Sequence, residues 1–426
     1  MKKIKFNLFL IVGALTLTMS SCTDDLDIKS DDPLVFLSDE FFEQPDAYRQ
    51  GLAGVYGNLS LTGTTGAGSS NIQGIDAGTS QYGRCLWYSQ NLSTDEVLWS
   101  YENDPGTREI QRNIWTASNP IFRGMYGRGM FQVALVNEFL RQTTPEKLAS
   151  RGITSQSEID EINDFRNEVK VLRALAYYHA MDLFGNVPFV TEADRVGAFT
   201  PEQIMRADLF EYIESEIKAI ENDLTAANAV AYGRASASAA HALLAKMYLN
   251  AEVYTGTSRY ADCATYCEKI INSNQFQLDD VYQDVFLADN NTSPEIIFPI
   301  VYDGLYAQTW GGTTFMICSA LGGSMVAADY GVNGKWAGNR ATRPFIEKFT
   351  DTTEDSRWMF YTAGQQIDIT SMSTFTQGYA NPKYKNKTKD GLNGSNNATS
   401  AHVDVDFPMF RLADVFLMYA EAKFRT

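Results

Sequence analysis

The sequence "EVKVLRALAYYHAMDLFGNVPFV", residues Glu168–Val190, decides how this chain folds. Apolar side chains recur every three or four residues through it and through the segment before it, a spacing that places them on one face of an α-helix. We expect this helix to run from Ser155 to Phe184. The residues expected on its buried face are Phe165, Val169, Leu172, Ala176, His179 and Leu183.

A second helical stretch, "RASASAAHALLAKMYLNA" at Arg234–Ala251, is followed by another at Tyr260–Asn272. Both long helices carry alanines where a neighbouring helix must approach closely. These are Ala174, Ala176 and Ala180 in the first, and Ala239, Ala242 and Ala245 in the second. Helix pairs of this size with small contact residues are typical of tetratricopeptide repeats. The sequence therefore predicts a mostly α fold built as a tetratricopeptide-like superhelix, a scaffold that supplies no chemistry itself.

The rest of the chain alternates between further helices and irregular segments. Helices are expected at residues 45–58 and 122–141, and another is expected to open at the capping box "TPEQ", Thr200–Gln203. Residues 294–304 read as a strand and residues 309–324 as loop, strand and loop. Residues 351–405, rich in Gly, Asn, Thr and Ser, are expected to be irregular, and residues 407–424 to form a last helix.

The segment Leu61–Arg84 is rich in Gly, Ser and Thr, and we expect it to form a long loop. It lacks the Lys-Ser/Thr pair and the following helix of a phosphate-binding loop. Long loops of this kind in compact proteins are usually functional or disordered.

The composition limits the possible partners. The 426 residues include only 3 histidines and carry a net charge of −17. So few histidines argue against a His-rich metal site or several His-dependent catalytic steps. The acidic balance and the lack of a basic stripe argue against nucleic acid as a partner.

Residues 1–22 are expected to be a lipoprotein signal peptide. Three lysines precede a short apolar segment, and small residues then lead to Cys22, which we expect to be lipidated after cleavage. The alternative is an ordinary secretory signal that happens to contain a cysteine. The acidic "TDDLD" after Cys22 resembles a signal for export to the cell surface, and residues 24–37 read as a tether. The expectation is a protein held on the outer membrane by its lipid anchor and facing outward.

Several stretches together resemble the SusD/RagB family of outer-membrane nutrient-binding lipoproteins. They are Glu168–Val190, Gly233–Gly256, "PEIIFPI" at Pro294–Ile300 and "FRLADVFLMYAEA" at Phe410–Ala422. The resemblance implies one SusD-like domain over residues 23–426, in which tetratricopeptide-like helices carry an irregular binding region with short strands. It also implies a non-catalytic protein that partners a SusC-like TonB-dependent transporter. The family's usual C-terminal portion is expected to be absent, which would leave an apolar face of the last helix exposed.

The same resemblance assigns a binding site. The acidic stretch "TDEVLWSYEND", Thr94–Asp104, holds two aromatic rings one residue apart, which point the same way in an extended segment. Likeness to the starch-binding member of the family implies an arc of three rings with polar groups at its edge. The resemblance implies starch or a malto-oligosaccharide as the ligand, and sugar rings do stack on aromatic faces. The residues implied are Trp99, Tyr101 and Trp310 for the arc, and Asp76, Arg84 and Asp104 for the edge.

Other interpretations of these residues stay open. Asp104 stands where the starch-binding member has an amide, and Trp99 and Tyr101 could instead belong to the core. An enzyme would use Asp95 with Glu96, or Glu102 with Asp104, as an acid–base pair. The domain could also bind another glycan or nutrient, or act as a protein-interaction scaffold.

No cofactor is expected, apart from a possible structural Ca²⁺. Asp404 and Asp406 of "VDVDF", joined by Asp289 or Asn291, could supply the hard oxygens that Ca²⁺ prefers. The alternative is a solvated cap at the start of the last helix. The four cysteines after Cys22 are expected to be free thiols, since no histidine lies near them in the sequence to complete a zinc site. They are Cys85, Cys263, Cys267 and Cys318.

Overall fold

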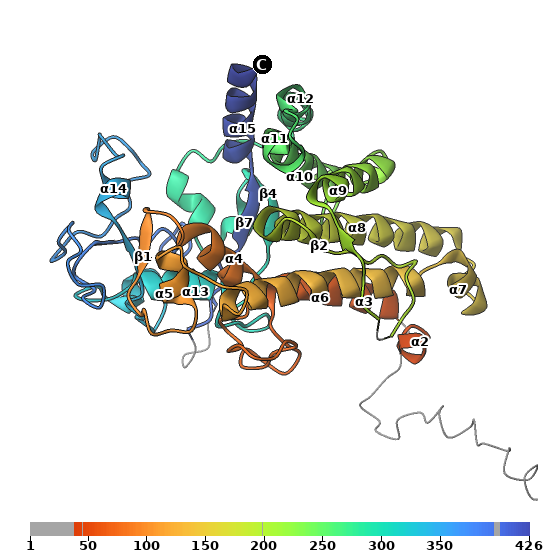
Figure 1. Cartoon of the computed structure of the whole chain (residues 1–426), viewed down its shortest axis with the longest axis horizontal. Helices are drawn as coiled ribbons and strands as arrows, with labels where there is room; N and C mark the ends of the chain where they lie inside the picture. Colours follow the sequence, from red (N-terminus) through yellow and green to blue (C-terminus); the bar gives the residue numbers. More distant parts are fainter. Residues whose placement is uncertain (1–37, 45, 198, 396–400) are drawn as a thin grey trace, which may run out of the picture. The chain divides into compact units, whose positions relative to one another are not determined.

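The computed structural model describes residues 38–44, 46–197, 199–395 and 401–426 (Figure 1). The signal peptide, Cys22 and the expected tether lie outside these residues. The chain divides into two compact units, residues 1–47 and residues 48–426. The described part of the first unit holds the short helix α2 (Ser38–Phe41), where the rings of Phe41 and Phe42 meet edge-on at 5.0 Å.

The second unit is built mainly from helices, which confirms the predicted mostly α class. Its helices before the long α8 are α3 (Ala47–Ser60), α4 (Tyr82–Asn91), α5 (Thr107–Gln111), α6 (Pro120–Gln142) and α7 (Pro145–Ser150). After α8 (Gln156–Phe184) come α9 (Arg206–Ile220), α10 (Ala237–Leu249), α11 (Ala251–Thr255), α12 (Tyr260–Ile271), α13 (Gly312–Ala320), α14 (Arg343–Ile346) and α15 (Leu412–Arg425). Short 3-10 helices lie at Tyr282–Phe286, Asn290–Thr292 and Ala327–Tyr330.

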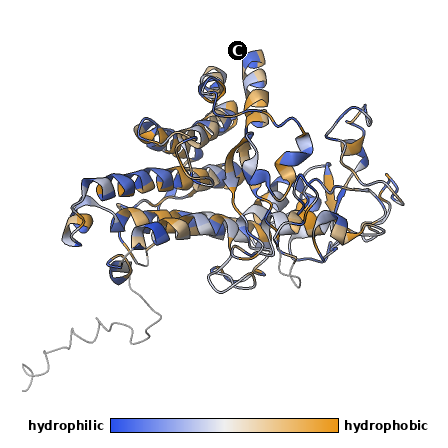
Figure 2. Ribbon diagram, turned by 180° about the vertical axis from the view of Figure 1, so that it is seen from behind, coloured by the Kyte–Doolittle hydropathy of each residue, from blue (hydrophilic) through white to orange (hydrophobic). Residues whose placement is uncertain are grey.

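The long helices pack on one another in sequence order, as stacked helix pairs do. Helix α6 packs on α8, α8 on α9, α10 on α12, and α12 on α15 (Figure 1). Hydrophilic and hydrophobic residues are interspersed along the whole of α6 and α8 (Figure 2). The alanines expected at close contacts, among them Ala174, Ala176, Ala239 and Ala242, are all buried. None of the described helices combines the length and the apolar character that crossing a bilayer requires.

The strands are short and form three small antiparallel sheets. β1 (Val97–Trp99) pairs with β5 (Asn339–Ala341), and β5 with β6 (Tyr379–Ala380). β2 (Val187–Pro188) pairs with β3 (Gln203–Ile204), and β4 (Ile296–Ile300) with β7 (Phe407–Arg411). The sheet of β1, β5 and β6 places the residues that follow Val97 beside the residues that precede Ala341. The candidate site described below lies at this point.

Three sequence-based predictions of local structure were wrong. The "TPEQ" segment does not open a helix: Gln203 pairs with Pro188 across β2 and β3, and α9 begins only at Arg206. Residues 309–324 contain helix α13 in place of a strand. Residues Phe407–Arg411 form strand β7, so the last helix begins at Leu412. Helix α13 was missed because all nine of its residues are buried, which leaves no amphipathic pattern to detect.

The Gly/Ser-rich loop before α4 is held by Arg128 of α6. This side chain is fully buried and makes five hydrogen bonds, all to neutral oxygens. Its Nε donates to the Ser80 carbonyl at 2.8 Å, and its Nη2 donates to the Thr62 carbonyl at 2.9 Å. Burial lowers the pKa of the Arg128 guanidinium to about 10. One helix residue thus fixes both ends of the loop between residues 62 and 80.

We predict that Arg128→Met destabilises the protein by about 3 kcal/mol, because it leaves several buried loop oxygens without donors. Arg123→Met, an exposed arginine five positions earlier on the same helix, is the matched control and should stay within about 0.5 kcal/mol of the parent. Urea unfolding followed by circular dichroism measures both. Equal effects of the two substitutions would show that the Arg128 hydrogen bonds do not stabilise the loop.

Candidate functional site

The N-terminus of α4 is the first element of the site. Gln81, fully buried, caps the helix by accepting a hydrogen bond from the Arg84 backbone N–H at 2.9 Å. The same side chain accepts from Gly312 N–H at 2.8 Å and donates to the Leu59 carbonyl at 2.8 Å. Gln81 therefore ties together the end of α3, the start of α4 and the start of α13, and it fixes the position of Arg84.

Arg84 links this helix to the segment before α13. Its Nη1 donates to the backbone carbonyl of Trp310 at 3.2 Å. Its guanidinium lies over the ring of Phe315, 4.4 Å from the centroid, and its other nitrogens donate to the Tyr88 hydroxyl. Burial raises the pKa of Tyr88 to about 12, with the Arg84 charge acting in the opposite direction. The guanidinium is thus held in one orientation beside Trp310.

The predicted polar residues line one cavity. Asp76, Arg84 and Asp104 face a space of about 520 Å³, together with Ile75, Pro105 and Pro120 among others. Asp76 is exposed in the loop before α4. Its Oδ1 accepts hydrogen bonds from the Thr79 N–H and the Thr79 hydroxyl, and its Oδ2 takes part in neither of these two bonds. The structure therefore brings together all three polar groups that the family resemblance implies.

Trp99 and Tyr101 do not share an environment. Trp99 is 2% exposed and its ring is covered by Tyr88, Phe315 and Gly338. Tyr101 is 46% exposed. Strand β1 ends at Trp99, so the rule that alternate residues point the same way does not extend to Tyr101. The burial of Trp99 differs from the expectation that its ring presents an open face to a ligand.

The buried Trp99 instead positions its neighbours. Its indole N–H donates to the Asp104 carboxylate at 3.0 Å, and its ring meets the Tyr101 ring edge-on at 5.9 Å. The Asp104 backbone N–H also donates to the Tyr101 carbonyl at 3.0 Å. Trp99, Tyr101 and Asp104 are therefore one interlocked turn in which the tyrosine ring faces outward.

A third ring, which the sequence did not single out, belongs to Trp336, which is partly buried and packs against a core cluster that includes Cys318 and Leu321. The Tyr101 hydroxyl donates to the Trp336 carbonyl at 2.6 Å. The Trp336 ring lies 6.2 Å from the ring of Trp310, which is 38% exposed, and the two ring planes are inclined by 45°. The His402 ring also packs on Trp310, with the two ring centroids 4.4 Å apart. The rings nearest one another here are thus Tyr101 and Trp310, both exposed, and the partly buried Trp336.

Backbone pairing around β5 explains why Trp336 lies there. The Trp336 N–H donates to the Cys318 carbonyl and the Gly338 N–H to the Ser319 carbonyl, each at 2.8 Å, so the segment follows the end of α13. The Ser100 N–H donates to the Gly338 carbonyl at 2.8 Å and continues the β1–β5 pairing. A tryptophan close to glycines in a loop, as in "NGKWAG", is the signal that could have identified Trp336, because Trp310 in "TWGG" also has glycines beside it.

The acidic residues near the rings have separate hydrogen-bond and ion-pair partners. Glu102 accepts from Arg112 at 2.7 Å, and Asp104 accepts from Trp99. Asp95 lines a different cavity, with Arg343 and Asp368 among its other residues. Two pairs were considered for acid–base catalysis, Asp95 with Glu96 and Glu102 with Asp104. Among the described residues, no hydrogen bond of this turn joins the carboxylates of either pair to a shared partner.

The aspartates considered for Ca²⁺ accept hydrogen bonds from the protein. The Asp404 carboxylate accepts from the Gly304 N–H and from Ser395, and the Asp406 carboxylate accepts from the Tyr302 N–H and the Tyr232 hydroxyl. Burial raises the pKa of Asp406 to about 6. Within the described ranges, no three His, Cys, Asp or Glu residues are grouped so as to hold a metal ion. The four cysteines expected to be free are free, and all four are buried.

Comparison with known proteins identifies relatives of this chain. The sequence model of the SusD family matches residues 226–426. The chain is 29% identical to the starch-binding protein SusD of Bacteroides thetaiotaomicron, over 97% of this chain and 80% of SusD. It is 23% identical to SusD-like protein P25 of Formosa agariphila, over 95% of this chain and 76% of that protein.

Solved structures share the fold at lower identity. A SusD homologue from Bacteroides thetaiotaomicron superposes with a TM-score of 0.70 at 18% identity, covering 91% of this chain and 75% of the other. Surface glycan-binding protein A of the same species, in complex with laminarihexaose, gives a TM-score of 0.65 at 18% identity, covering 89% and 79%. These likenesses establish the fold and leave the ligand to be argued from the site.

Proposed function

Since the chain belongs to the SusD family, we propose that it binds starch or malto-oligosaccharides without catalysing a reaction on them. The observation that carries this proposal is the group of rings at Tyr101, Trp310 and Trp336, of which Tyr101 and Trp310 are exposed and Trp336 is partly buried. Pyranose rings have apolar C–H faces that pack on aromatic faces, and their hydroxyl groups need polar partners. Arg84, Asp76 and Asp104 supply such partners beside the rings.

The inclination of the rings favours a curved glycan. The planes of Trp310 and Trp336 differ by 45°, so a straight, flat chain could lie against only one of them at a time. An α-1,4-glucan bends along its length and can place successive sugar units on rings that turn away from each other. A flat β-1,4-linked chain such as cellulose is the poorer match.

Each residue has a distinct part in this proposal. Tyr101, Trp336 and Trp310 stack on sugar faces. Asp76 and Arg84 bond sugar hydroxyl groups at the cavity edge. Asp104 shares that cavity, and its carboxylate is oriented by Trp99, which acts as a positioning residue beneath the surface.

We predict that Trp310→Ala, Trp336→Ala and Tyr101→Ala each weaken maltoheptaose binding by about five-fold or more, since stacking on one ring contributes on the order of 1 kcal/mol. Arg84→Ala should weaken it to a lesser extent. Isothermal titration calorimetry of the purified protein with maltoheptaose, laminarihexaose, cellohexaose and a xylan oligomer measures both affinity and preference.

Two control variants accompany this titration. Phe424→Ala removes a ring that is 91% exposed at the end of α15, and Asp95→Ala removes a carboxylate outside the cavity. Both should bind maltoheptaose as the parent does. Preferred binding of laminarihexaose would keep the site but change the glycan, and unaltered binding by all three ring variants would overturn the site.

We also propose that the protein acts on the outer cell surface, held by a lipid on Cys22. The lysine-rich start, the short apolar segment and the cysteine after small residues support this location. Cys22→Ala should leave the protein unlipidated and remove it from the outer-membrane fraction, as measured by fractionation and immunoblotting. Ser21→Thr, next to the cysteine, is the control, and equal membrane retention of Cys22→Ala would contradict the anchor.

The last part of the proposal is delivery of the bound glycan to a SusC-like TonB-dependent transporter, which the family resemblance supports. We predict that the protein, solubilised from its native membrane in mild detergent, co-purifies with a barrel protein of that type. Mass spectrometry of the purified complex identifies the partner. Isolation of the solubilised protein alone, across several detergents, would count against delivery by direct contact.

A further inference from the structure

The backbone of Trp310 is fixed, but its ring can still turn. The Trp310 carbonyl accepts from Arg84 at 3.2 Å. Gly78 packs so closely on the other side that a Cβ added there would lie 2.5 Å from the Trp310 Cβ. Neither contact reaches the indole, which can rotate about its Cα–Cβ and Cβ–Cγ bonds. A contact with the ring itself is therefore needed to select one orientation.

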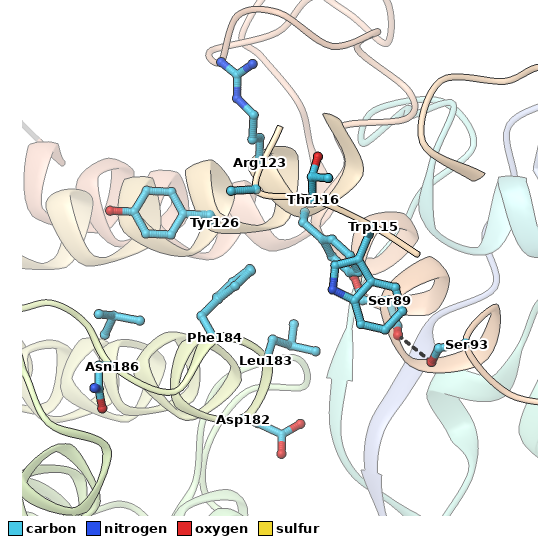
Figure 3. A pocket seen from close by; sticks show the side chains of 13 residues that line it. Ser89, Ser93, Trp115, Thr116, Arg123, Tyr126, Asp182, Leu183, Phe184 and Asn186 are labelled. Carbon is cyan, nitrogen blue, oxygen red and sulfur yellow. Dashed lines mark hydrogen bonds between the residues drawn. The ribbon is translucent and has the colours of Figure 1, made fainter. Parts of the chain in front are cut away.

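Two tryptophans are exposed among the described residues, and each has another aromatic side chain beside it. Trp115, 44% exposed, stands at one end of a cavity between α6 and α8 (Figure 3) and meets Phe122 edge-on at 5.3 Å. Trp310, 38% exposed, lies closer to its neighbour: its ring centroid is 4.4 Å from that of His402, and the two planes are inclined by 49°. The Trp336 ring, at 6.2 Å, is farther from Trp310. His402 is therefore the nearest ring that can orient this indole.

The segment 401–406 places His402 against Trp310. Alternate residues of this segment are buried in the core cluster on which Trp336 also packs, namely Ala401, Val403 and Val405. The residues between them contact the segment that leads to Trp310. Asp404 accepts from the Gly304 N–H and Asp406 from the Tyr302 N–H, each at 2.8 Å. The two segments are thus joined by hydrogen bonds, and His402 continues the same side toward Trp310.

His402 offers Trp310 a fixed aromatic surface. Its side chain is buried, with only 5% exposed. Burial lowers the pKa of the His402 imidazole, so the ring is neutral at pH 7. A neutral imidazole contacts an indole as one aromatic ring contacts another, without the attraction of a full charge. The contact therefore depends on the shape and position of the His402 ring.

We propose that His402 is a positioning residue for sugar binding. It holds the Trp310 ring in the orientation that stacks on a sugar, and it keeps the 45° inclination between Trp310 and Trp336 that suits a curved glycan. An exposed indole without such a contact occupies several rotamers, and a ligand that selects one of them binds more weakly. The inference rests on the proposed function, because it names a residue that prepares the same site without touching the sugar.

A double-mutant cycle, measured by isothermal titration calorimetry with maltoheptaose, tests the proposal. His402→Ala should weaken binding by about three-fold, the effect of one side chain that the ligand must now immobilise. Adding His402→Ala to Trp310→Ala should weaken binding no further, because His402 acts only through that ring. His402→Phe restores a flat ring and should bind nearly as the parent does.

A second measurement follows the ring in the absence of sugar. Fluorine NMR of the protein labelled with fluorinated tryptophan gives one resonance for each of the 6 tryptophans, and Trp310→Phe identifies that of Trp310. In His402→Ala this resonance should shift and broaden, while that of Trp115 should stay in place. His402→Leu fills the buried space without a flat ring and should give the same result, which keeps the test available if His402→Ala does not fold.

His241→Ala is the matched control for both measurements. His241 is a partly buried histidine of α10 that packs on Tyr266, with the ring centroids 5.5 Å apart. Its removal should change neither the affinity for maltoheptaose nor the Trp310 resonance. Circular dichroism confirms that each variant is folded.

The outcomes separate this inference from the proposed function. Weaker binding by Trp310→Ala together with parent-like binding by His402→Ala overturns the inference and leaves the site intact. Effects that multiply in the double variant also overturn it, since His402 would then act other than through Trp310. A Trp310 resonance that His402→Ala leaves unchanged overturns the positioning of the ring without reference to any sugar. Parent-like binding by all three ring variants overturns the proposed site, and the role of His402 in sugar binding with it.

Discussion

The buried guanidinium of Arg128 is the constraint on which the binding region depends. A charged group inside a protein is costly unless its hydrogen bonds are satisfied, and here neutral oxygens from Asn58, Thr62, Ser70 and Ser80 satisfy them. The loop that carries Asp76 must adopt the one path that brings those oxygens to the guanidinium. Helix α6 therefore determines the shape of a Gly/Ser-rich segment that has little apolar surface of its own.

Side chains replace regular secondary structure as the source of order in the irregular region. Gln81 joins three segments that have no strand pairing with one another, and Asp406 accepts from both Tyr302 and Tyr232. Buried backbone groups need partners wherever they lie, and these side chains provide them where helices and sheets do not. The rings of Trp310 and Trp336 thus stand on loops that hydrogen bonds hold in place. A rigid ring array loses little conformational entropy when a sugar binds to it.

The parts of this fold that followed from the sequence are those with a local pattern. Helix α8 was expected at Ser155–Phe184 and observed at Gln156–Phe184, because its apolar residues repeat with the helical period. Helix α13 has no such pattern, since every face of it is buried. The family resemblance implied Asp76, Arg84 and Asp104 as polar groups of one site, and the structure places them around one cavity. Alternation along the extended segment predicted an open Trp99 ring, which is buried. Trp336 could not be found from spacing, because its contact with Tyr101 joins residues 235 positions apart.

The distinction between Trp99 and Tyr101 explains how an acidic turn can serve binding. In water, a flexible run of carboxylates next to aromatic residues would leave the rings mobile and partly covered. Here the buried Trp99 uses its indole N–H to hold Asp104, and Glu102 is occupied by Arg112. The Tyr101 hydroxyl is in turn anchored to the backbone at Trp336. The polar groups of this turn bond to one another and fix its conformation, so the surfaces that stay available to a ligand are aromatic. A site made in this way presents stacking surfaces with a few fixed hydrogen-bonding groups, which is the chemistry that a neutral sugar requires.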